Sequence, residues 1–407
     1  MSSAASLSVR LPTDDRRLET YAVRGTALFT ATAPQRPFTR VAYSAAHVVA
    51  DPSAATDPWL TAELDWDATI AYRQRLWSLG LGVAEAMDTA QRGMGLDWPT
   101  SLELIRRSLD AARDHPGALV ASGCGTDHLA VDASTTVDDV IRAYEEQMAA
   151  IESLGGRLIV MASRALARVA TGAADYERVY DRILMQSKQP VILHWLGDMF
   201  DPALAGYWGS TDVDTAMATA LGVIAAKPGK VDGIKISLLD KDKEIAMRRR
   251  LPATGGPDGL GVRMYTGDDF NYAELIAGDG VGGAANRQHS DALLGIFDAI
   301  APAASAALAA LGAGDLDRFH ALLAPTVPLS RHIFQAPTRF YKTGIVFLAW
   351  LNGHQSHFTM VGGQQSARSL AHFAEIFRLA DAAGLLERPE LAVVRMRHLL
   401  ALHGIDG

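Results

Sequence analysis

Cysteine and long apolar runs are nearly absent from this chain of 407 residues. Its one cysteine, Cys124, excludes an internal disulfide and a cluster of thiolate metal ligands, and it is more typical of a small buried residue than of a nucleophile. No apolar run reaches the length of about 18 residues that marks a membrane-spanning helix, and no signal peptide is recognisable. These absences predict a cytoplasmic protein without a membrane partner.

Basic residues are also scarce. The 38 lysines and arginines are outnumbered by 46 aspartates and glutamates, which gives a net charge of -8 and a pI near 5.8. The longest basic run is Arg248-Arg249-Arg250, too short for the electrostatic footprint of a nucleic-acid partner. Because 49% of the residues are apolar and 21% are charged, the chain can instead bury one large core or two smaller ones.

The chain does contain a repeated alternation of short apolar segments and longer helical patterns. Eight segments are typical of buried strands, at residues 39–46, 82–86, 118–122, 157–162, 190–195, 231–236, 261–265 and 280–284. Helical patterns separate most of them, so consecutive strands are expected to pair in parallel. Eight such units within about 250 residues predict a (β/α)8 TIM barrel. A doubly wound sheet is less favoured, because the first strand runs into Ala45-Ala46-His47 and not into a glycine-rich turn.

Three regions follow from this pattern. Residues 1–37 are predicted to be an irregular N-terminal arm, residues 38–290 the barrel, and residues 291–407 a C-terminal helical extension. Helical patterns in the last part are found at residues 290–311, 315–323, 341–351, 367–383 and 389–402. The extension is expected to assemble the chain into a homodimer or homotetramer.

Ionisable and polar residues follow each apolar strand. In a barrel the carboxyl ends of the strands converge on the active site, so these residues are the candidates for chemistry. The candidates are His47, Glu85, Asp88, Asp127, His128, Arg164, His194, Asp198, Lys235, Tyr265, Asp268 and Asn286. Together they predict a polar pocket on an apolar scaffold that binds a small molecule.

The most informative candidate is Lys235, in the middle of the apolar run Val231-Asp232-Gly233-Ile234-Lys235-Ile236-Ser237. Burial penalises a charged ammonium and lowers its pKa, which favours the nucleophilic free amine. Such an amine can form a Schiff base with a carbonyl substrate. The alternative is a strand-end lysine whose amine reaches solvent.

The order of motifs resembles a known family. Pro190–Trp195, then Gly233-Ile234-Lys235, then Tyr265-Thr266-Gly267-Asp268-Asp269, then Gly278–Gly283 with Asn286, is similar to the last four strands of the dihydrodipicolinate synthase and N-acetylneuraminate lyase superfamily. The resemblance implies a class I aldolase or lyase on a (β/α)8 barrel with a helical extension. It also implies that Lys235 forms the imine, that no organic cofactor is needed, and that the protein is an oligomer.

Two departures from that family alter the expected substrate. His194 stands where the family usually has a proton-relaying tyrosine, and a histidine can also act as general acid or base. The family's carboxylate-binding arginine is replaced by the segment Leu196–Phe200, which argues against pyruvate. We therefore expect a hydroxylated oxo compound derived from a sugar or polyol, with His47, Glu85 and Asp88 binding its hydroxyl groups.

Other interpretations of the same residues remain open. His47, Glu85, His128, His194 and Asp198 are residue types that bind divalent metals, as in barrel enzymes that hydrolyse or epimerise sugars. Their spacing matches no known metal motif. Asp268 and its neighbour Asp269 could cap a helix, and Arg164 could hold a carboxylate or phosphate or form a surface ion pair. The barrel could also bind a ligand without catalysis.

Overall fold

The computed structural model describes residues 7–13, 15–29, 33–34, 37–279 and 288–406. Eight parallel strands close into a barrel, so the predicted (β/α)8 fold is confirmed. The strands are β3 (Ala42–Ala45), β4 (Gly82–Glu85), β5 (Val120–Cys124), β6 (Arg157–Met161), β7 (Val191–Leu196), β8 (Val231–Ser237), β9 (Arg263–Thr266) and β10 (Asp291–Leu294).

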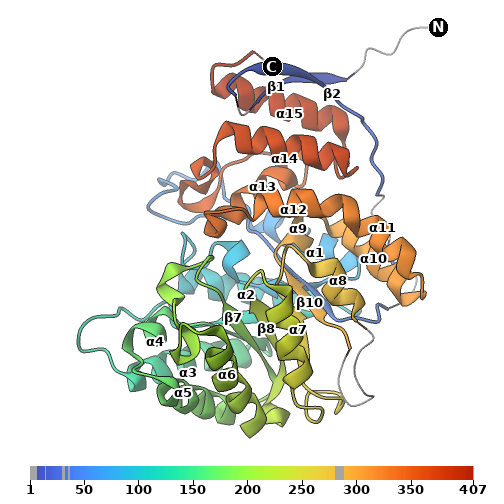
Figure 1. The fold of residues 1–407 in the computed structure, drawn as a ribbon. Helices are drawn as coiled ribbons and strands as arrows, with labels where there is room; N and C mark the ends of the chain where they lie inside the picture. Colours follow the sequence, from blue (N-terminus) through green and yellow to red (C-terminus); the bar gives the residue numbers. More distant parts are fainter. Residues whose placement is uncertain (1–6, 14, 30–32, 35–36, 280–287, 407) are drawn as a thin grey trace, which may run out of the picture.

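Helices connect these strands and cover the outside of the barrel (Figure 1). They are α1 (Trp66–Ser78), α2 (Trp98–Ala112), α3 (Val137–Ser153), α4 (Arg164–Val169), α5 (Ala173–Gln186), α6 (Val213–Ala226), α7 (Lys241–Arg250) and α8 (Tyr272–Ala277). Local sequence defines where they begin. In α3, for example, Thr136 and Asp139 form a capping box, and Tyr144 and Met148 lie on the buried face one turn apart.

The inside of the barrel is filled by alternate residues of each strand. Tyr43, Ile159, Ile192, Tyr265 and Leu293 form one buried layer across it. This layer separates the two ends of the barrel interior, so polar groups at one end do not reach the other.

The last strand of the barrel lies later in the chain than the sequence indicated. The segment predicted as the eighth strand, residues 280–284, lies outside the described residues. The eighth strand is β10, which pairs with β9 and β3 and begins after residue 290. The helix expected over residues 290–311 is therefore wrong at its start. Residues Asp291–Leu294 are all buried, and a short buried apolar run of this kind fits a strand as well as a helix.

The C-terminal extension is helical, as predicted, and stacks over one end of the barrel (Figure 1). Its helices are α9 (Ile296–Ala299), α10 (Ala301–Gly312), α11 (Leu316–Leu323), α12 (Val327–Ile333), α13 (Tyr341–Leu351), α14 (Leu370–Ala382) and α15 (Pro389–Leu402). Helix α13 is buried at every residue. It lies between the barrel and the outer helices and is the central element of the extension.

The N-terminal arm is not irregular throughout, which corrects the expectation for residues 1–37. Strands β1 (Ser8–Pro12) and β2 (Leu18–Ala22) form an antiparallel pair that packs against α14 and α15. Asp381 of α14 accepts hydrogen bonds from the Tyr21 hydroxyl at 2.8 Å and the Arg24 N–H at 2.9 Å. This contact spans most of the chain, so local sequence did not reveal it.

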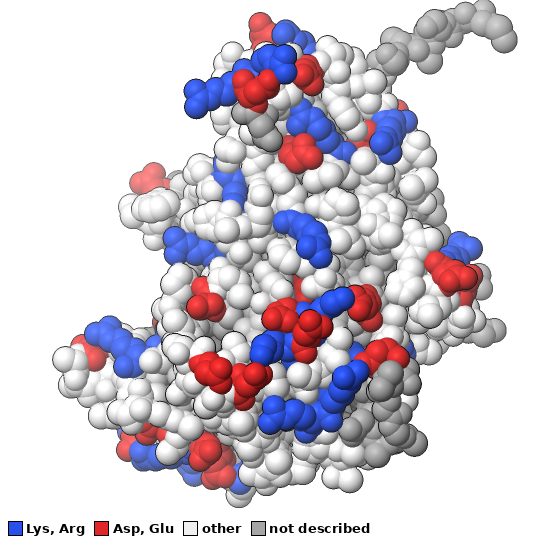
Figure 2. All heavy atoms as spheres, viewed as in Figure 1, with Lys and Arg blue, Asp and Glu red and all other residues white. Residues whose placement is uncertain are grey.

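Charges of both signs are interspersed on the face shown in Figure 2, with wide uncharged areas between them. None of the described helices combines the length and the apolar character that crossing a membrane would require.

Candidate active site

Lys235 lies on β8 inside the carboxyl end of the barrel. It is 8% exposed and is paired in register with His194 of β7 and Tyr265 of β9. Its side chain runs across Gly267, where an added Cβ would lie 2.8 Å from the lysine Cε. The same Cβ would lie 2.4 Å from Ser237 Oγ and 2.5 Å from the Ile236 carbonyl oxygen, so all of β8 from Lys235 to Ser237 leaves room only for glycine at position 267.

The Lys235 amine has no hydrogen bond or ion pair with any residue that the structure describes. Burial lowers its pKa, while the negative charges of Asp269 and Asp88 oppose that effect. Asp269 is itself buried and accepts a hydrogen bond from the Ile296 N–H at 2.9 Å. Burial raises the pKa of Asp269 to about 7, although this hydrogen bond and the Lys235 charge oppose it. The site thus combines an amine of lowered pKa with a carboxyl group that titrates near neutrality.

Two more polar side chains at this end lack partners. Neither ring nitrogen of His194 has a hydrogen-bond partner among the described residues, and the same holds for the Ser237 hydroxyl. Burial and the Lys235 charge hold the pKa of His194 well below its usual range, so the imidazole is neutral at pH 7. Buried polar groups are normally satisfied, so these exceptions indicate that a ligand or water completes the site.

A cavity of about 200 Å³ lies beside His194, which is one of its lining residues, whereas Lys235, Asp269 and Ser237 are not. Its polar lining is His194, Asp88, Arg92, Thr126, Asp127, Arg164 and Asp201. Apolar residues such as Leu196 and Met161 line the remainder. The volume suits a small metabolite, and the lining combines apolar walls with a few placed polar groups, as ligand sites usually do.

Ion pairs fix the charged walls of the cavity. Arg92 holds Asp127 through two hydrogen bonds of 2.8 and 3.0 Å. Burial alone would raise the pKa of Asp127, but the charge and hydrogen bonds of Arg92 hold it below its usual value. Arg164 donates from Nε to Asp201. Asp127 is therefore ionised, and both aspartate side chains line the cavity, where their oxygen atoms can accept hydrogen bonds from a ligand.

Aromatic rings of the extension form a roof over the barrel end. An added Cβ on Gly295, just after β10, would lie 3.1 Å from atoms of both Phe334 and Tyr341. These two rings stack with centroids 4.3 Å apart, and Phe200 packs edge-on against both. The Tyr341 hydroxyl hydrogen-bonds Thr89 at 2.7 Å. The extension therefore encloses the lysine and reduces its access to water.

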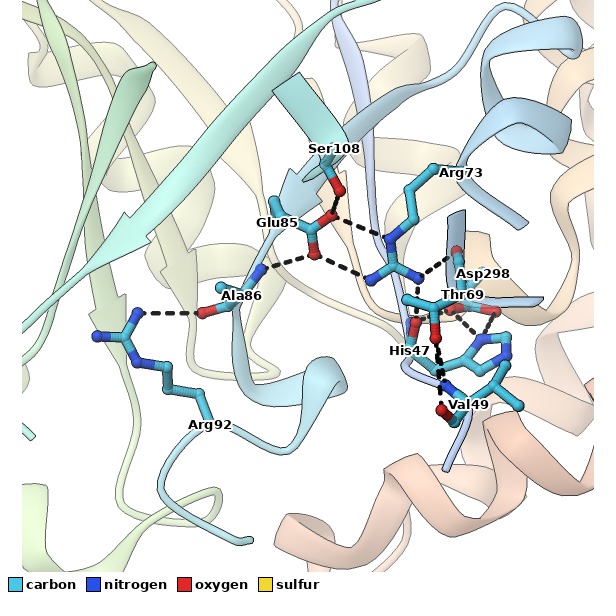
Figure 3. Close-up of polar contacts among 9 residues, drawn as sticks. All are labelled: His47, Val49, Thr69, Arg73, Glu85, Ala86, Arg92, Ser108 and Asp298. Atoms are coloured by element: carbon cyan, nitrogen blue, oxygen red, sulfur yellow. Dashed lines mark hydrogen bonds and ion pairs between the residues drawn. The ribbon is translucent and has the colours of Figure 1, made fainter. Parts of the chain in front are cut away.

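His47 and Glu85, predicted to bind substrate, instead belong to a buried network beside the barrel (Figure 3). Glu85 accepts two hydrogen bonds of 2.9 Å from Arg73 of α1 and one from Ser108. His47 bonds Asp298 through Nδ1 at 2.8 Å, and its carbonyl accepts from Arg73. Neither residue lines the cavity described above. Their partners come from α1 and the extension, which the strand-end argument did not consider.

The other predicted residues divide between the cavity and separate positions. Asp88, Asp127 and Arg164 line it together with His194. His128 borders an adjoining groove that shares Asp127 and Arg164 with the cavity.

Three predicted residues lie elsewhere, and the structure does not describe a fourth. Asp198 is exposed. Tyr265 points toward the opposite barrel end, where its hydroxyl meets Asp232 at 3.3 Å. Asp268 accepts from the N–H groups of Phe270 and Asn271 in the turn ahead of α8, whose N-cap residue is Asn271, so it does not cap that helix. Asn286 lies outside the described residues.

The structure also bears on the metal and thiol alternatives. Among the residues it describes, no three His, Cys, Asp or Glu side chains come together in a way that could hold a metal ion. Cys124 is fully buried, and burial raises its thiol pKa to about 12, so it stays protonated at neutral pH.

A family model described as "Protein of unknown function (DUF993)" matches residues 9–405, nearly the whole chain. The chain belongs to the DUF993 family. A search of curated proteins finds no match to this DUF993 member.

Solved structures with a similar fold come from the dihydrodipicolinate synthase family. A putative dihydrodipicolinate synthetase from Pseudomonas aeruginosa superposes with a TM-score of 0.61 at 16% identity, over 84% of this chain and 99% of that one. YagE from E. coli K12, solved in complex with pyruvate, superposes with a TM-score of 0.60 at 12% identity, over 90% of this chain and 99% of that one. Dihydrodipicolinate synthase from Aquifex aeolicus superposes with a TM-score of 0.56 at 12% identity, over 90% of this chain and 99% of that one. The predicted relationship is confirmed at the level of fold, for a sequence that has diverged widely.

Sequence reasoning did not select several residues that the structure brings to this site. Asp269 was interpreted as a helix cap, although the order Gly267-Asp268-Asp269 after β9 was noticed. Arg92 and Asp201 were not considered, because each lies several residues beyond its strand. Tyr341 and Lys342 come from the extension, and no strand-end rule points to them.

Proposed function

We propose that this protein is a class I lyase that cleaves or dehydrates a hydroxylated oxo compound through a Schiff base on Lys235. The observation that carries the proposal is the buried amine of Lys235, which has no partner among the described residues and faces a roofed end of a (β/α)8 barrel. Burial increases the fraction of the amine that is uncharged, and only the uncharged amine attacks a carbonyl carbon. The fold of dihydrodipicolinate synthases supports the same chemistry by analogy.

In the proposed reaction, the Lys235 Nζ attacks the carbonyl carbon, and loss of water gives an imine that is protonated on nitrogen. A base removes the proton of the β-hydroxyl, the Cα–Cβ bond breaks, and its electron pair moves into the protonated imine. An aldehyde or ketone fragment leaves, and an enamine remains on the lysine. Protonation of the enamine at Cα, followed by hydrolysis, releases the second fragment and restores the free amine.

Two side chains are suited to the proton transfers. His194 is neutral, lines the cavity, and can accept the hydroxyl proton on a ring nitrogen. Asp269, with a pKa of about 7, can exchange protons with the amine as the imine forms and hydrolyses. Neither role requires a bound cofactor, because the protonated imine itself accepts the electron pair.

The cavity lining supports a sugar- or polyol-derived substrate. Asp88, Asp127 and Thr126 present oxygen atoms that accept hydrogen bonds from hydroxyl groups. An apolar residue, Leu196, lines the cavity at the carboxyl end of β7. We therefore favour a polyhydroxylated carbonyl compound over pyruvate.

Borohydride trapping tests the proposal. Wild-type protein is incubated with a panel of ketoses, aldoses and oxo acids, reduced with sodium borohydride, and examined by intact mass and peptide mapping. We expect a covalent adduct on Lys235 with at least one compound and none in Lys235→Met. The second buried lysine, Lys342, serves as an internal control for unspecific reaction of buried amines. A panel that leaves Lys235 unmodified, or modifies both lysines equally, would falsify the Schiff-base mechanism.

A further inference from the structure

A second buried amine lies near the site and takes no part in the proposed reaction. Of the seven lysines in the chain, Lys235 and Lys342 are buried, and Lys342 is only 2% exposed. Lys342 stands in the first turn of α13, next to the roof residue Tyr341. Its ammonium lies 5.3 Å from the centre of the Tyr341 ring.

Lys342 has a poor partner for a buried charge. Its Nζ lies 3.0 Å from the thioether sulfur of Met94, and it has no carboxylate within 4.0 Å in the described part of the chain. A thioether is a weak hydrogen-bond acceptor. Burial lowers the pKa of Lys342 to about 8, although Asp88 opposes the effect, so most of the amine is still protonated at pH 7. A charge in this position is costly unless a ligand compensates it.

The surroundings of Lys342 connect it to the cavity. The charges that act on its ammonium include Asp88, Arg164 and Asp201, and all three of these residues line the cavity. Neither lysine lines the cavity itself. The Lys342 Nζ contacts Met94, and the neighbouring Gly93 lies against the guanidinium of Arg164, which does line the cavity. Lys342 therefore approaches the cavity wall from α13.

Arg164 adds a free donor edge beside Lys342. It bonds Asp201 through Nε, and neither of its Nη groups has a hydrogen-bond partner among the residues described. The guanidinium lies against Gly93, where an added Cβ would be 2.6 Å from Nη1. With 45% of its side chain exposed, Arg164 can adjust to a ligand. Guanidinium edges of this kind bind carboxylate and phosphate oxygens in pairs.

We propose that Lys342 and Arg164 form a subsite for an anionic group, a carboxylate or a phosphate, at the end of the substrate remote from the carbonyl carbon that Lys235 attacks. This inference rests on the proposed function for the identity of the reacting carbon, but not for the existence of the subsite. It narrows the substrate to a polyhydroxylated oxo compound with a terminal negative charge. The C-terminal extension would then contribute substrate recognition as well as the roof.

Equilibrium binding can test the subsite without the reaction, in Lys235→Met protein that cannot form an imine. The probes are fructose 6-phosphate, with a remote phosphate, 5-keto-gluconate, with a remote carboxylate, and neutral fructose. Pyruvate, whose carboxylate adjoins its carbonyl, is the control for position. We expect at least one remote anion to bind tenfold or more tightly than fructose and than pyruvate. The probe that does so distinguishes phosphate from carboxylate.

The matched variants are Lys342→Met and Lys342→Arg in the same Lys235→Met background. Methionine is close to lysine in side-chain length and can pack against Met94, so the variant should fold. A thermal melt checks this. Lys342→Met should reduce the preference for the remote anion about tenfold, and Lys342→Arg should keep most of it. Equal affinity for charged and neutral probes, or no change in Lys342→Met, overturns the subsite.

The two proposals fail in different ways. Remote-anion binding that depends on Lys342, without any borohydride adduct on Lys235, would leave the subsite supported and remove the Schiff-base reaction. An adduct on Lys235 with no preference for charged probes would support the Schiff-base reaction and remove the subsite.

Discussion

The two ends of the barrel interior differ in whether their buried charged side chains form ion pairs. At the amino end, Asp232 lies between Arg157 and Arg263, with nitrogen to oxygen distances of 3.1 and 2.8 Å, and Arg263 also faces Asp291 at 3.4 Å. At the carboxyl end, Lys235 and His194 have no hydrogen-bond partner among the described residues. Both ends are buried to a similar degree. The presence or absence of an ion pair, and not the degree of burial, therefore distinguishes a structural charge from a charge that is available to a ligand.

Replacing Lys235 gives the largest expected change in function. Lys235→Met should abolish imine trapping, because no nucleophile remains. Since the amine has no partner to lose, the free energy of unfolding should stay the same or rise by about 1–2 kcal/mol. Trapping and urea unfolding on the same preparation test both effects. A destabilised variant would mean that the lysine is a structural residue.

The opposite result is expected at the amino end. Asp232→Ala removes the carboxylate that Arg157 and Arg263 share, while the partly buried Arg263 keeps Asp258 and Asp291, so the free energy of unfolding should fall by about 1–3 kcal/mol. Trapping at Lys235 should persist in the fraction that remains folded. Urea unfolding checks the first effect and borohydride reduction the second. Loss of less than about 1 kcal/mol would show that the two ends do not differ as described.

His194 tests the carboxyl end with a smaller change. His194→Leu removes two ring nitrogens that bond no described residue, so stability should change by less than about 1 kcal/mol. If the imidazole accepts the substrate proton, the rate of cleavage should fall about 100-fold or more, while adduct formation on Lys235 continues. Single-turnover kinetics with a compound that forms the adduct separates the two steps. An unchanged cleavage rate would assign the proton transfer to another group.

Glu244 is a buried carboxyl group that accepts hydrogen bonds from hydroxyl groups and forms no ion pair with any described residue, so it adds a third case to the comparison of the two barrel ends. Ser290 and Thr266 donate to it at 2.7 and 2.9 Å, and burial raises its pKa to about 8, above the unfolded value near 4.5. Between about pH 4.5 and 8, Glu244 is ionised in the unfolded state but still protonated in the folded state. The free energy of unfolding therefore falls as the pH rises, by up to about 1.4 kcal/mol per pH unit. Glu244→Gln should flatten unfolding free energies measured from pH 5 to 8. A slope equal to that of wild type would contradict this.

The sequence predicted the barrel well because its signal is periodic and local. Alternating apolar strands and helices identify parallel pairing without knowledge of distant contacts. The strand-end rule also led to five residues that lie two or three positions from the ends of their strands, and their roles stay predictions: Lys235, His194, Asp88, Asp127 and Arg164. The eighth strand was misplaced because β10 has only four residues and merges with the apolar helices that follow.

The rest of the site depends on contacts between distant segments, which one sequence does not encode visibly. Glu85 follows a strand as the rule requires, yet Arg73 of α1 holds it outside the cavity. Tyr341 and Lys342 reach the barrel only because α13 packs over it. Asp269 looked like a helix cap, and only the closed barrel brings its carboxyl group close enough to Lys235 for the two charges to interact.

The contact between the β1–β2 hairpin and Asp381 has a consequence for how the chain is made. Ribosomal synthesis delivers the hairpin first and α14 almost last, so the hairpin stays without its final partner until most of the protein has been translated. Because α14 also packs on α13, a prematurely terminated chain would lack support for the aromatic cover above Lys235. Lys235 is therefore enclosed only near the end of translation, and if it forms the proposed Schiff base, truncated products should lack activity.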